Sequence, residues 1–169
     1  ELGIEGQEAL LSASVLMVGA GGLGSSAGLY LGSAGVGKLT VVDHDVVDAT
    51  NLQRQVAHTL ERIGQPKALS LQTAIAAINP DVNVVPVTQR ADAALLATLV
   101  AQADVVLDCT DNFATRHAIN RACFALGKPL VSGAAIRLDG QLSVYDPRDA
   151  TSPCYACVFP ENSGVEETR

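Results

Sequence analysis

A glycine-rich turn between a predicted strand and a predicted helix constrains the fold of this chain more than any other feature. The strand is predicted at residues 15–18, and the helix runs from the turn to about Gly35. Between them, Gly19, Gly21 and Gly24 fit the pattern G-x-G-x-x-G. The first glycine permits a tight turn, the second lets a phosphate approach the backbone, and the third lets the helix sit close to the strand. The turn therefore predicts a site for a mononucleotide or a dinucleotide.

The same helix has one face without side chains, because glycine recurs every fourth residue at Gly24, Gly28 and Gly32. Residues four apart lie on one face of an α-helix. We therefore expect this face to pack closely on the sheet.

Short apolar segments alternate with helical segments along the rest of the chain. The predicted strands are 39–42, 82–87, 105–107 and 130–131, and the predicted helices are 66–78, 91–102 and 113–126. This alternation predicts an α/β, doubly wound, Rossmann-like fold with a mostly parallel sheet. Residues 141–145 alternate in polarity after Asp139-Gly140, a hairpin signal, so we expect an antiparallel extension at the C-terminal end. We expect a single domain over residues 1–169, with a core of Val, Leu, Ile and Ala because only 4% of the residues are aromatic.

An acid follows the second predicted strand, at the edge of the sheet where ligands of such folds bind. Asp43 lies about 20 residues beyond Gly24, the spacing at which an acid holds the ribose hydroxyls of an adenosine. This position favours NAD and ATP equally.

Two cations that follow Asp43 have no special use in a dehydrogenase. Arg54 lies in the polar segment 45–58, and Lys67 opens the next helix. The planar fork of Arg54 and the point charge of Lys67 both suit phosphate oxygens. Together they favour ATP over NAD.

Asp111 and Asn112 follow the predicted strand at 105–107, so they can reach the same cleft. A carboxylate beside phosphates commonly holds Mg²⁺, which makes Asp111 a candidate magnesium ligand. An equal alternative is that the pair caps the helix that begins at Phe113.

These residues belong to motifs in which the chain resembles the ThiF/MoeB/HesA family, the bacterial relatives of ubiquitin-activating enzymes. The branch it resembles most adenylates sulfur carriers for molybdopterin and thiamine. The matching stretches run in order along nearly the whole chain and are 19–24, 34–37, 43–45, 51–55, 64–67, 78–80, 108–112, 131–134 and 154–157.

The resemblance implies ATP-dependent adenylation of the C-terminal Gly-Gly carboxylate of a small ubiquitin-like sulfur-carrier protein, with release of pyrophosphate. It implies that the residues Arg54, Lys67 and Asp111 are catalytic. It places the nucleotide on the residues Gly19, Gly21, Gly22, Gly24, Asp43, Asp45, Asn51, Arg54, Gln55, Lys67, Asp111 and Asn112. In this assignment Asp43 binds ribose, Asn51, Arg54 and Lys67 hold phosphates, and Asp111 ligates Mg²⁺.

The resemblance also implies parts that this chain does not contain. They are an arginine before Glu1 that enters a partner subunit's site, and a carrier-docking part after Arg169. We therefore expect the chain to be a piece of a longer protein that forms a homodimer. The sequence leaves open which carrier is used and whether a thioester or persulfide step follows.

Cys154 and Cys157 have the spacing of half a tetrahedral Zn²⁺ site, with two further ligands outside this chain. The alternative is a redox pair, which we consider weaker because the pair does not follow a strand at a helix start. Cys109 and Cys123 are expected to be buried small hydrophobes. Surface or capping roles are expected for the residues His44, His58 and His117.

Composition excludes two classes of partner. The net charge is −7 without a Lys/Arg cluster, so we expect no nucleic acid partner. No apolar run approaches the roughly 20 residues that span a bilayer, and no leader is visible, so we expect a cytoplasmic protein with no membrane partner. Two alternative functions remain, an NAD-dependent oxidoreductase and a non-catalytic subunit of a heterodimeric activating enzyme.

Overall fold

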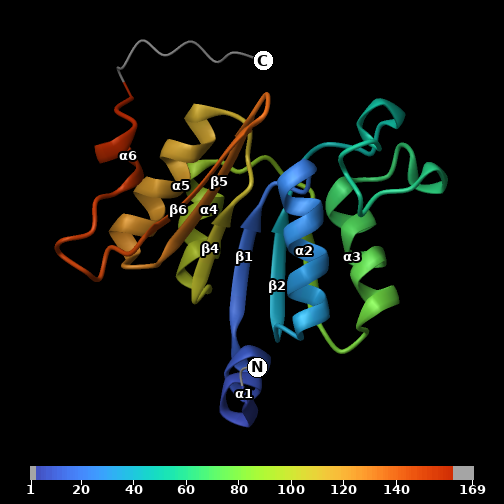
Figure 1. Cartoon of the computed structure of the whole chain (residues 1–169), viewed down its shortest axis with the longest axis horizontal. Helices are drawn as coiled ribbons and strands as arrows, with labels where there is room; N and C mark the ends of the chain where they lie inside the picture. The colour runs from blue at the N-terminus through green and yellow to red at the C-terminus, as the bar shows by residue number, and fades with distance from the viewer. Residues whose placement is uncertain (1–2, 162–169) are drawn as a thin grey trace.

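Six strands form a single sheet with the first strand of the chain near its centre. The computed structural model describes residues 3–161 (Figure 1). The strands are β1 (Ser14–Val18), β2 (Lys38–Val42), β3 (Asn83–Val87), β4 (Val105–Asp108), β5 (Leu130–Ile136) and β6 (Asp139–Tyr145), in the order β3-β2-β1-β4-β5-β6. Neighbours from β3 to β5 are parallel, and β6 is antiparallel to β5. The predicted fold class is confirmed. The predicted domain, 1–169, includes residues 1–2 and 162–169, which lie outside the described residues.

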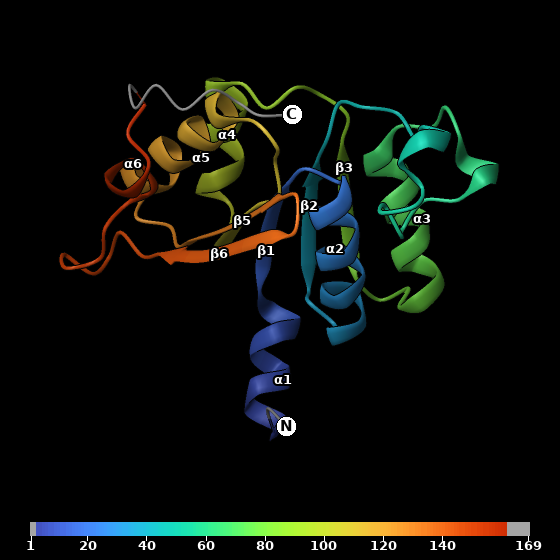
Figure 2. The same cartoon turned by 45° about the horizontal axis from the view of Figure 1, so that its top comes forward.

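Four helices cover the two faces of the sheet (Figure 2). They are α2 (Gly22–Ala34) and α3 (Lys67–Ile78) on one face, and α4 (Ala93–Ala101) and α5 (Phe113–Leu126) on the other. Four further elements were not predicted from the sequence, namely the helices α1 (Gly3–Ser12) and α6 (Tyr155–Val158) and the 3₁₀ turns η1 (Ala49–Asn51) and η2 (Leu60–Arg62). Among the described residues, no helix is long and apolar enough to cross a bilayer.

Side chains of β1 alternate between two aliphatic cores, as the pleat of a strand requires. Met17 packs in the core that contains Leu71 and Ile75 of α3. Leu16 packs in the core that contains Leu96 of α4 and Ile119 of α5. Both cores are built mainly from aliphatic residues, as the low aromatic content predicts.

The glycine face of α2 packs mainly on a helix, which corrects the expectation that it packs on the sheet. A Cβ on Gly28 would lie 2.9 Å from a methyl carbon of Leu71, and one on Gly32 would lie 2.7 Å from a methyl carbon of Ile75. The nearest atom of the sheet, Cε of Met17 in β1, would lie farther from a Cβ on Gly28, at 3.3 Å. The glycines therefore let α2 and α3 approach each other closely, and this contact sets the position of Lys67 at the start of α3.

The hairpin at the C-terminal end is confirmed, but its turn lies two residues earlier than the Asp139-Gly140 signal indicates. Ile136 pairs with Asp139, so the turn consists of Arg137 and Leu138. Arg137 has a φ of 56°, a conformation in which glycine is usual. Gly140 instead lies inside β6, opposite Ala135.

The strand order reverses at β1, which pairs with β2 on one side and β4 on the other. Val18 lies opposite both Val42 and Asp108. The residues that follow these three strands are therefore neighbours, namely Gly19, Asp43 and Cys109. Ligands of doubly wound folds bind at this point, outside the carboxyl ends of the strands.

Candidate functional site

The glycine turn has a backbone that excludes side chains at two positions. Gly19 has a φ of 100°, and a Cβ there would lie 2.6 Å from the Cys109 carbonyl oxygen. A Cβ on Gly24 would lie 1.9 Å from the Gly19 carbonyl oxygen. The first and third glycines of the motif are thus required by the turn itself. A Cβ on Gly21 would make only an ordinary contact, 3.6 Å from Nε2 of Gln55.

Asp43 holds the turn through the backbone of Ala20. The Ala20 N–H donates to Oδ2 of Asp43 at 2.7 Å, and the Asp45 N–H donates to Oδ1 at 2.8 Å. A carboxylate has about four acceptor positions, so two remain for other donors. The predicted ribose ligand therefore lies beside the glycine turn with acceptor capacity left.

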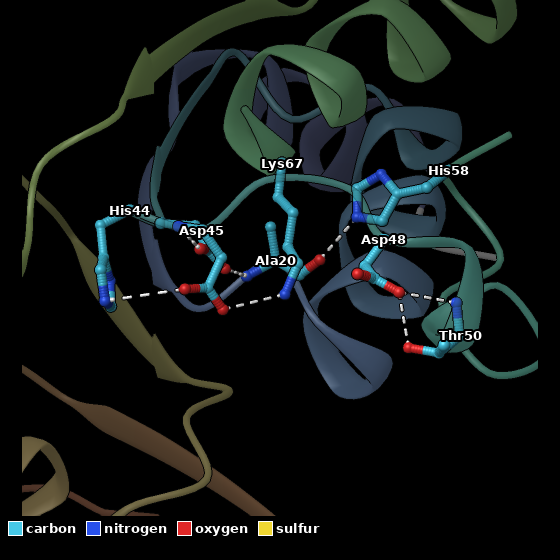
Figure 3. Close-up of polar contacts among 8 residues, drawn as sticks. Ala20, His44, Asp45, Asp48, Thr50, His58 and Lys67 are labelled. Carbon is cyan, nitrogen blue, oxygen red and sulfur yellow. Dashed lines mark hydrogen bonds and ion pairs between the residues drawn. The ribbon is translucent and has the colours of Figure 1, made fainter. Parts of the chain in front are cut away.

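Lys67 and Asp45 form an ion pair at the same edge of the sheet (Figure 3). Nζ of Lys67 lies 3.0 Å from Oδ2 of Asp45, and the Lys67 N–H donates to the Asp45 carbonyl oxygen at 2.9 Å. The Lys67 side chain is buried, whereas that of Asp45 is exposed. Since an unpaired buried ammonium is costly, Asp45 stabilises the charge of Lys67 in this structure.

Arg54 and Gln55 lie over the glycine turn. The aliphatic stem of Arg54 is 3.7 Å from the position of a Cβ on Gly22, while Arg54 as a whole is exposed. Gln55 is buried, and its Oε1 has no hydrogen-bond partner among the described residues. Because buried polar atoms are normally satisfied, this oxygen marks a place where a ligand or water would bind.

Asn51 lies in η1. The side chain of Asp48, which was not among the predicted site residues, caps this 3₁₀ turn. Asp48 accepts from the Thr50 N–H at 2.8 Å and from the Thr50 hydroxyl at 2.6 Å. The hydroxyl and backbone hydrogen bonds from Thr50 hold the pKa of Asp48 below its usual value. The Asn51 carbonyl oxygen accepts from the N–H of Gln55 at 3.0 Å. This hydrogen bond fixes the backbone of the segment that lies over the glycine turn.

A buried acid shapes the loop that carries Asp111. Asp108 accepts from the N–H and the hydroxyl of Thr110, at 3.0 and 2.7 Å, and from the Ser132 hydroxyl at 2.9 Å. Arg116 donates to the Thr110 carbonyl oxygen and lies 4.0 Å from Asp108. Asp111 is exposed at this edge of the sheet.

Asn112 is the N-cap of α5. Its Oδ1 accepts from the Thr115 N–H at 2.9 Å. The capping alternative is therefore confirmed for Asn112, and any contact with a nucleotide would come in addition to it.

His58 is buried beneath the glycine turn, so the expected surface or capping role is wrong. Nε2 lies 2.8 Å from the Ala20 carbonyl oxygen, and Nδ1 lies 2.9 Å from Oγ of Ser70. Burial lowers the pKa of His58, and the positive charges of Lys67 and Arg62 lower it further. The sequence gives no periodic signal for this contact, because His58 lies in a segment without regular structure.

His117 is also buried, against the expectation for it. Its ring meets that of Tyr155 edge to face with centroids 5.2 Å apart, and Nδ1 lies 3.6 Å from a carboxylate oxygen of Glu161. His44 is exposed as expected.

The cysteines fall into the two groups that the sequence predicts. Cys123 is buried and Cys109 is half-buried, and burial raises the pKa of both thiols to about 12. These thiols are therefore protonated near neutral pH and not reactive.

Cys154 and Cys157 lie close together near the C-terminal end of the described chain. Their Sγ atoms are 3.4 Å apart. Burial raises the pKa of Cys154, but hydrogen bonds from Cys157, Asn120 and Ala156 outweigh it and lower the pKa below its usual value. Cys154 is the N-cap of the short α6. A loop rather than a strand precedes this helix, so the pair does not follow a strand at a helix start, as expected.

The ThiF family matches this chain over residues 1–169. A molybdopterin-synthase adenylyltransferase of Escherichia coli is 51% identical over 162 residues, which are 94% of this chain and 65% of the relative. A sulfur carrier protein ThiS adenylyltransferase of the same species is 45% identical over 166 residues, which are 98% of this chain and 66% of the relative. This chain thus spans just under two thirds of the length of each.

Solved structures show the same fold. E. coli MccB with ATP superposes with a TM-score of 0.82 at 25% identity, over 89% of this chain and 46% of that protein.

Proposed function

Because the chain belongs to the ThiF family, we propose that the protein uses ATP to adenylate the C-terminal Gly-Gly carboxylate of a ubiquitin-like sulfur-carrier protein. Pyrophosphate is the second product, and sulfur transfer for molybdopterin or thiamine synthesis follows. The names of two relatives support this proposal, since both are adenylyltransferases and one acts on the sulfur carrier ThiS.

The buried Lys67 beside the glycine turn is the single observation that carries this proposal. The charge of an exposed lysine is solvated by water, whereas burial of an ammonium costs free energy unless a negative group is paired with it. Here that partner is the exposed Asp45, whose carboxylate can turn into solvent when phosphates arrive. Arg54, over Gly22, supplies a second cation at the same edge. Hydride transfer from NAD gives no role to this pair of cations.

The nucleotide would lie across the switch point of the sheet. Asp43 would accept from the ribose hydroxyls with its free acceptor positions. Gly21 and Gly22 open α2, and the free N–H groups at a helix N-terminus attract phosphate oxygens. The orphan Oε1 of Gln55 and the side chain of Asn51 would complete the polar lining.

The protein contributes positioning and charge neutralisation to the reaction. The carrier carboxylate attacks the α-phosphate, and pyrophosphate leaves from the opposite side. No general base is needed, because a carboxylate is already ionised near pH 7. Arg54 and Lys67 would neutralise charge on the phosphate oxygens, and Asp111 would hold Mg²⁺ beside them.

Cys154 and Cys157 are proposed as two ligands of a structural Zn²⁺. Their Sγ–Sγ distance of 3.4 Å is near the roughly 3.8 Å that a tetrahedral site with Zn–S bonds of about 2.3 Å requires. The lowered pKa of Cys154 also favours the thiolate that binds metal.

Two further properties belong to the same proposal. We expect a homodimer, since two-fold pairing is the commonest among soluble oligomers and would let an arginine of one subunit reach the other's phosphates. We expect the protein to act in the cytoplasm.

Isotope exchange between ATP and pyrophosphate tests the proposed function. The full-length protein should catalyse exchange only when a carrier that ends in Gly-Gly is present. A carrier that lacks the last glycine is the matched control. Binding of NAD without binding of ATP would overturn the proposal.

A further inference from the structure

We propose that His58 is a positioning residue that holds the Ala20 peptide of the glycine turn in the orientation that binds phosphate. This inference rests on the proposed function, because it assumes that the turn binds the phosphates of ATP. His58 does not touch the nucleotide itself. It acts through the backbone.

The Ala20 backbone is held from two sides. Its N–H donates to Oδ2 of Asp43 at 2.7 Å, and its carbonyl oxygen lies 2.8 Å from Nε2 of His58 (Figure 3). Asp43 follows β2, whereas His58 comes from the irregular segment before η2. The residue between the first two glycines of the turn is thus fixed by two side chains from different parts of the chain.

The hydrogen bonds indicate which tautomer the neutral ring of His58 adopts. A carbonyl oxygen only accepts, so Nε2 carries the hydrogen and donates to Ala20. In the neutral ring Nδ1 then accepts, and the donor is the hydroxyl of Ser70 at 2.9 Å. The Ser70 oxygen in turn accepts from Nη1 of Arg62 at 3.2 Å. Each hydrogen bond in this network therefore joins one donor to one acceptor.

The same chain connects the glycine turn to the helix that carries Lys67. Lys67 and Ser70 are three residues apart on α3, and both are buried. Residues at this spacing share a helix face. His58 therefore joins Ser70 of α3 to the turn, so the cation of Lys67 and the N–H groups of the turn keep a fixed separation.

Without this contact the turn would lose its orientation. Gly19 and Gly21 flank Ala20, and glycine allows many backbone conformations. The Ala20 carbonyl would also be left without its partner in a buried place. We therefore expect removal of the Nε2 donor to weaken ATP binding even where the fold survives.

Two variants of His58 separate its two hydrogen bonds. The amide of glutamine can occupy the place of Nε2, whereas the shorter amide of asparagine can occupy only that of Nδ1. His58→Gln thus keeps the donor to Ala20, and His58→Asn loses it. Ile119→Val on α5 is the matched control, because it loosens the core on the opposite face of the sheet.

The measurements are the Kd of MgATP by calorimetry, and KM and kcat in pyrophosphate exchange, with the melting temperature of each variant. His58→Asn should raise the Kd and the KM roughly five- to tenfold, the effect of one buried carbonyl left unpaired, with a smaller change in kcat. His58→Gln should stay within about twofold of wild type on the same scale. Ile119→Val should lower the melting temperature without a change in Kd.

The outcomes separate this inference from the proposed function. Wild-type protein that binds no ATP would overturn both. Wild-type protein that binds ATP, with equal Kd values for His58→Asn and His58→Gln, would overturn the role of His58 alone.

Discussion

Nζ of the buried Lys67 lies 3.0 Å from a carboxylate oxygen of Asp45, a residue whose own side chain is 56% exposed. The two partners therefore differ in mobility, because Asp45 can leave for solvent and Lys67 cannot. Phosphate oxygens that enter the site would replace the carboxylate on the ammonium. The cation is thus kept in place before the nucleotide binds, and this reduces the reorganisation that catalysis requires.

Lys67→Ala should lower the rate of carrier-dependent exchange at least about tenfold, which corresponds to about 1.4 kcal/mol of transition-state stabilisation. The reason is the loss of the fixed positive charge beside the glycine turn. Exchange kinetics at saturating ATP provide the measurement. Lys38→Ala is the control, because Lys38 begins β2 and lies at the end of that strand away from Asp43 and the glycine turn. Unchanged exchange in Lys67→Ala would remove this residue from the mechanism.

Asp111→Asn should impair exchange more than it impairs ATP binding. The amide keeps the shape of the side chain but loses the charge that would hold Mg²⁺. Titration of Mg²⁺ in the exchange assay should show a higher requirement in the variant. The idea is wrong if the variant matches wild type when Mg²⁺ is limiting.

The stability that His58 contributes should depend on pH. Burial lowers its pKa below 6.5 in the folded protein, so the unfolded chain binds the proton more tightly. The contribution is complete above about pH 6.5 and is lost as the pH falls through and below that value. Urea unfolding of wild type and His58→Gln between pH 7.5 and 5.5 isolates the effect, because all other titrating groups are shared. The stability difference between them should shift in favour of the variant at low pH, and a constant difference would contradict this.

The purified full-length protein should contain about one zinc per subunit, on the usual count of four cysteine ligands. Metal analysis after purification without chelator provides the measurement. Cys157→Ser should lose the metal, whereas Cys123→Ser, on the buried side of α5, should keep it. Protein without metal that forms a Cys154–Cys157 disulfide would support the redox alternative.

Light scattering at micromolar concentration should give the mass of a dimer. Exchange activity should then fall on dilution below the dissociation constant of the dimer. A fully active monomer would exclude both the dimer and an arginine supplied by the partner subunit.

The order of the elements and the glycine turn could be predicted from local sequence. The boundaries of α5 agree with the prediction, because Asn112 and Gly127 mark its two ends. The turn at Arg137 could not be predicted in the same way. Its position depends on the pairing of β5 with β6, and the local Asp139-Gly140 signal points elsewhere.

The site was predicted unevenly for a similar reason. Asp43 follows a strand and Lys67 begins a helix, so their places can be predicted from strand and helix ends. His58 and Arg62 come from the irregular segment before α3 and contact Ser70 of that helix, and no periodic pattern in the sequence predicts these contacts. The pairing of Asp45 with Lys67 is likewise a tertiary event.

The central place of β1 has a consequence for the way the chain is made. The N–H of Ser14, at the start of β1, bonds to the carboxylate of Asp104, 90 residues later in the chain. At a synthesis rate of about 5–20 residues per second, β1 therefore waits roughly 5 to 20 seconds at the ribosome before β4 emerges. During that interval one edge of this buried strand is open to pairing with other chains. Slower translation of residues 20–104 would lengthen this exposure, and chaperones would have their longest opportunity to bind there.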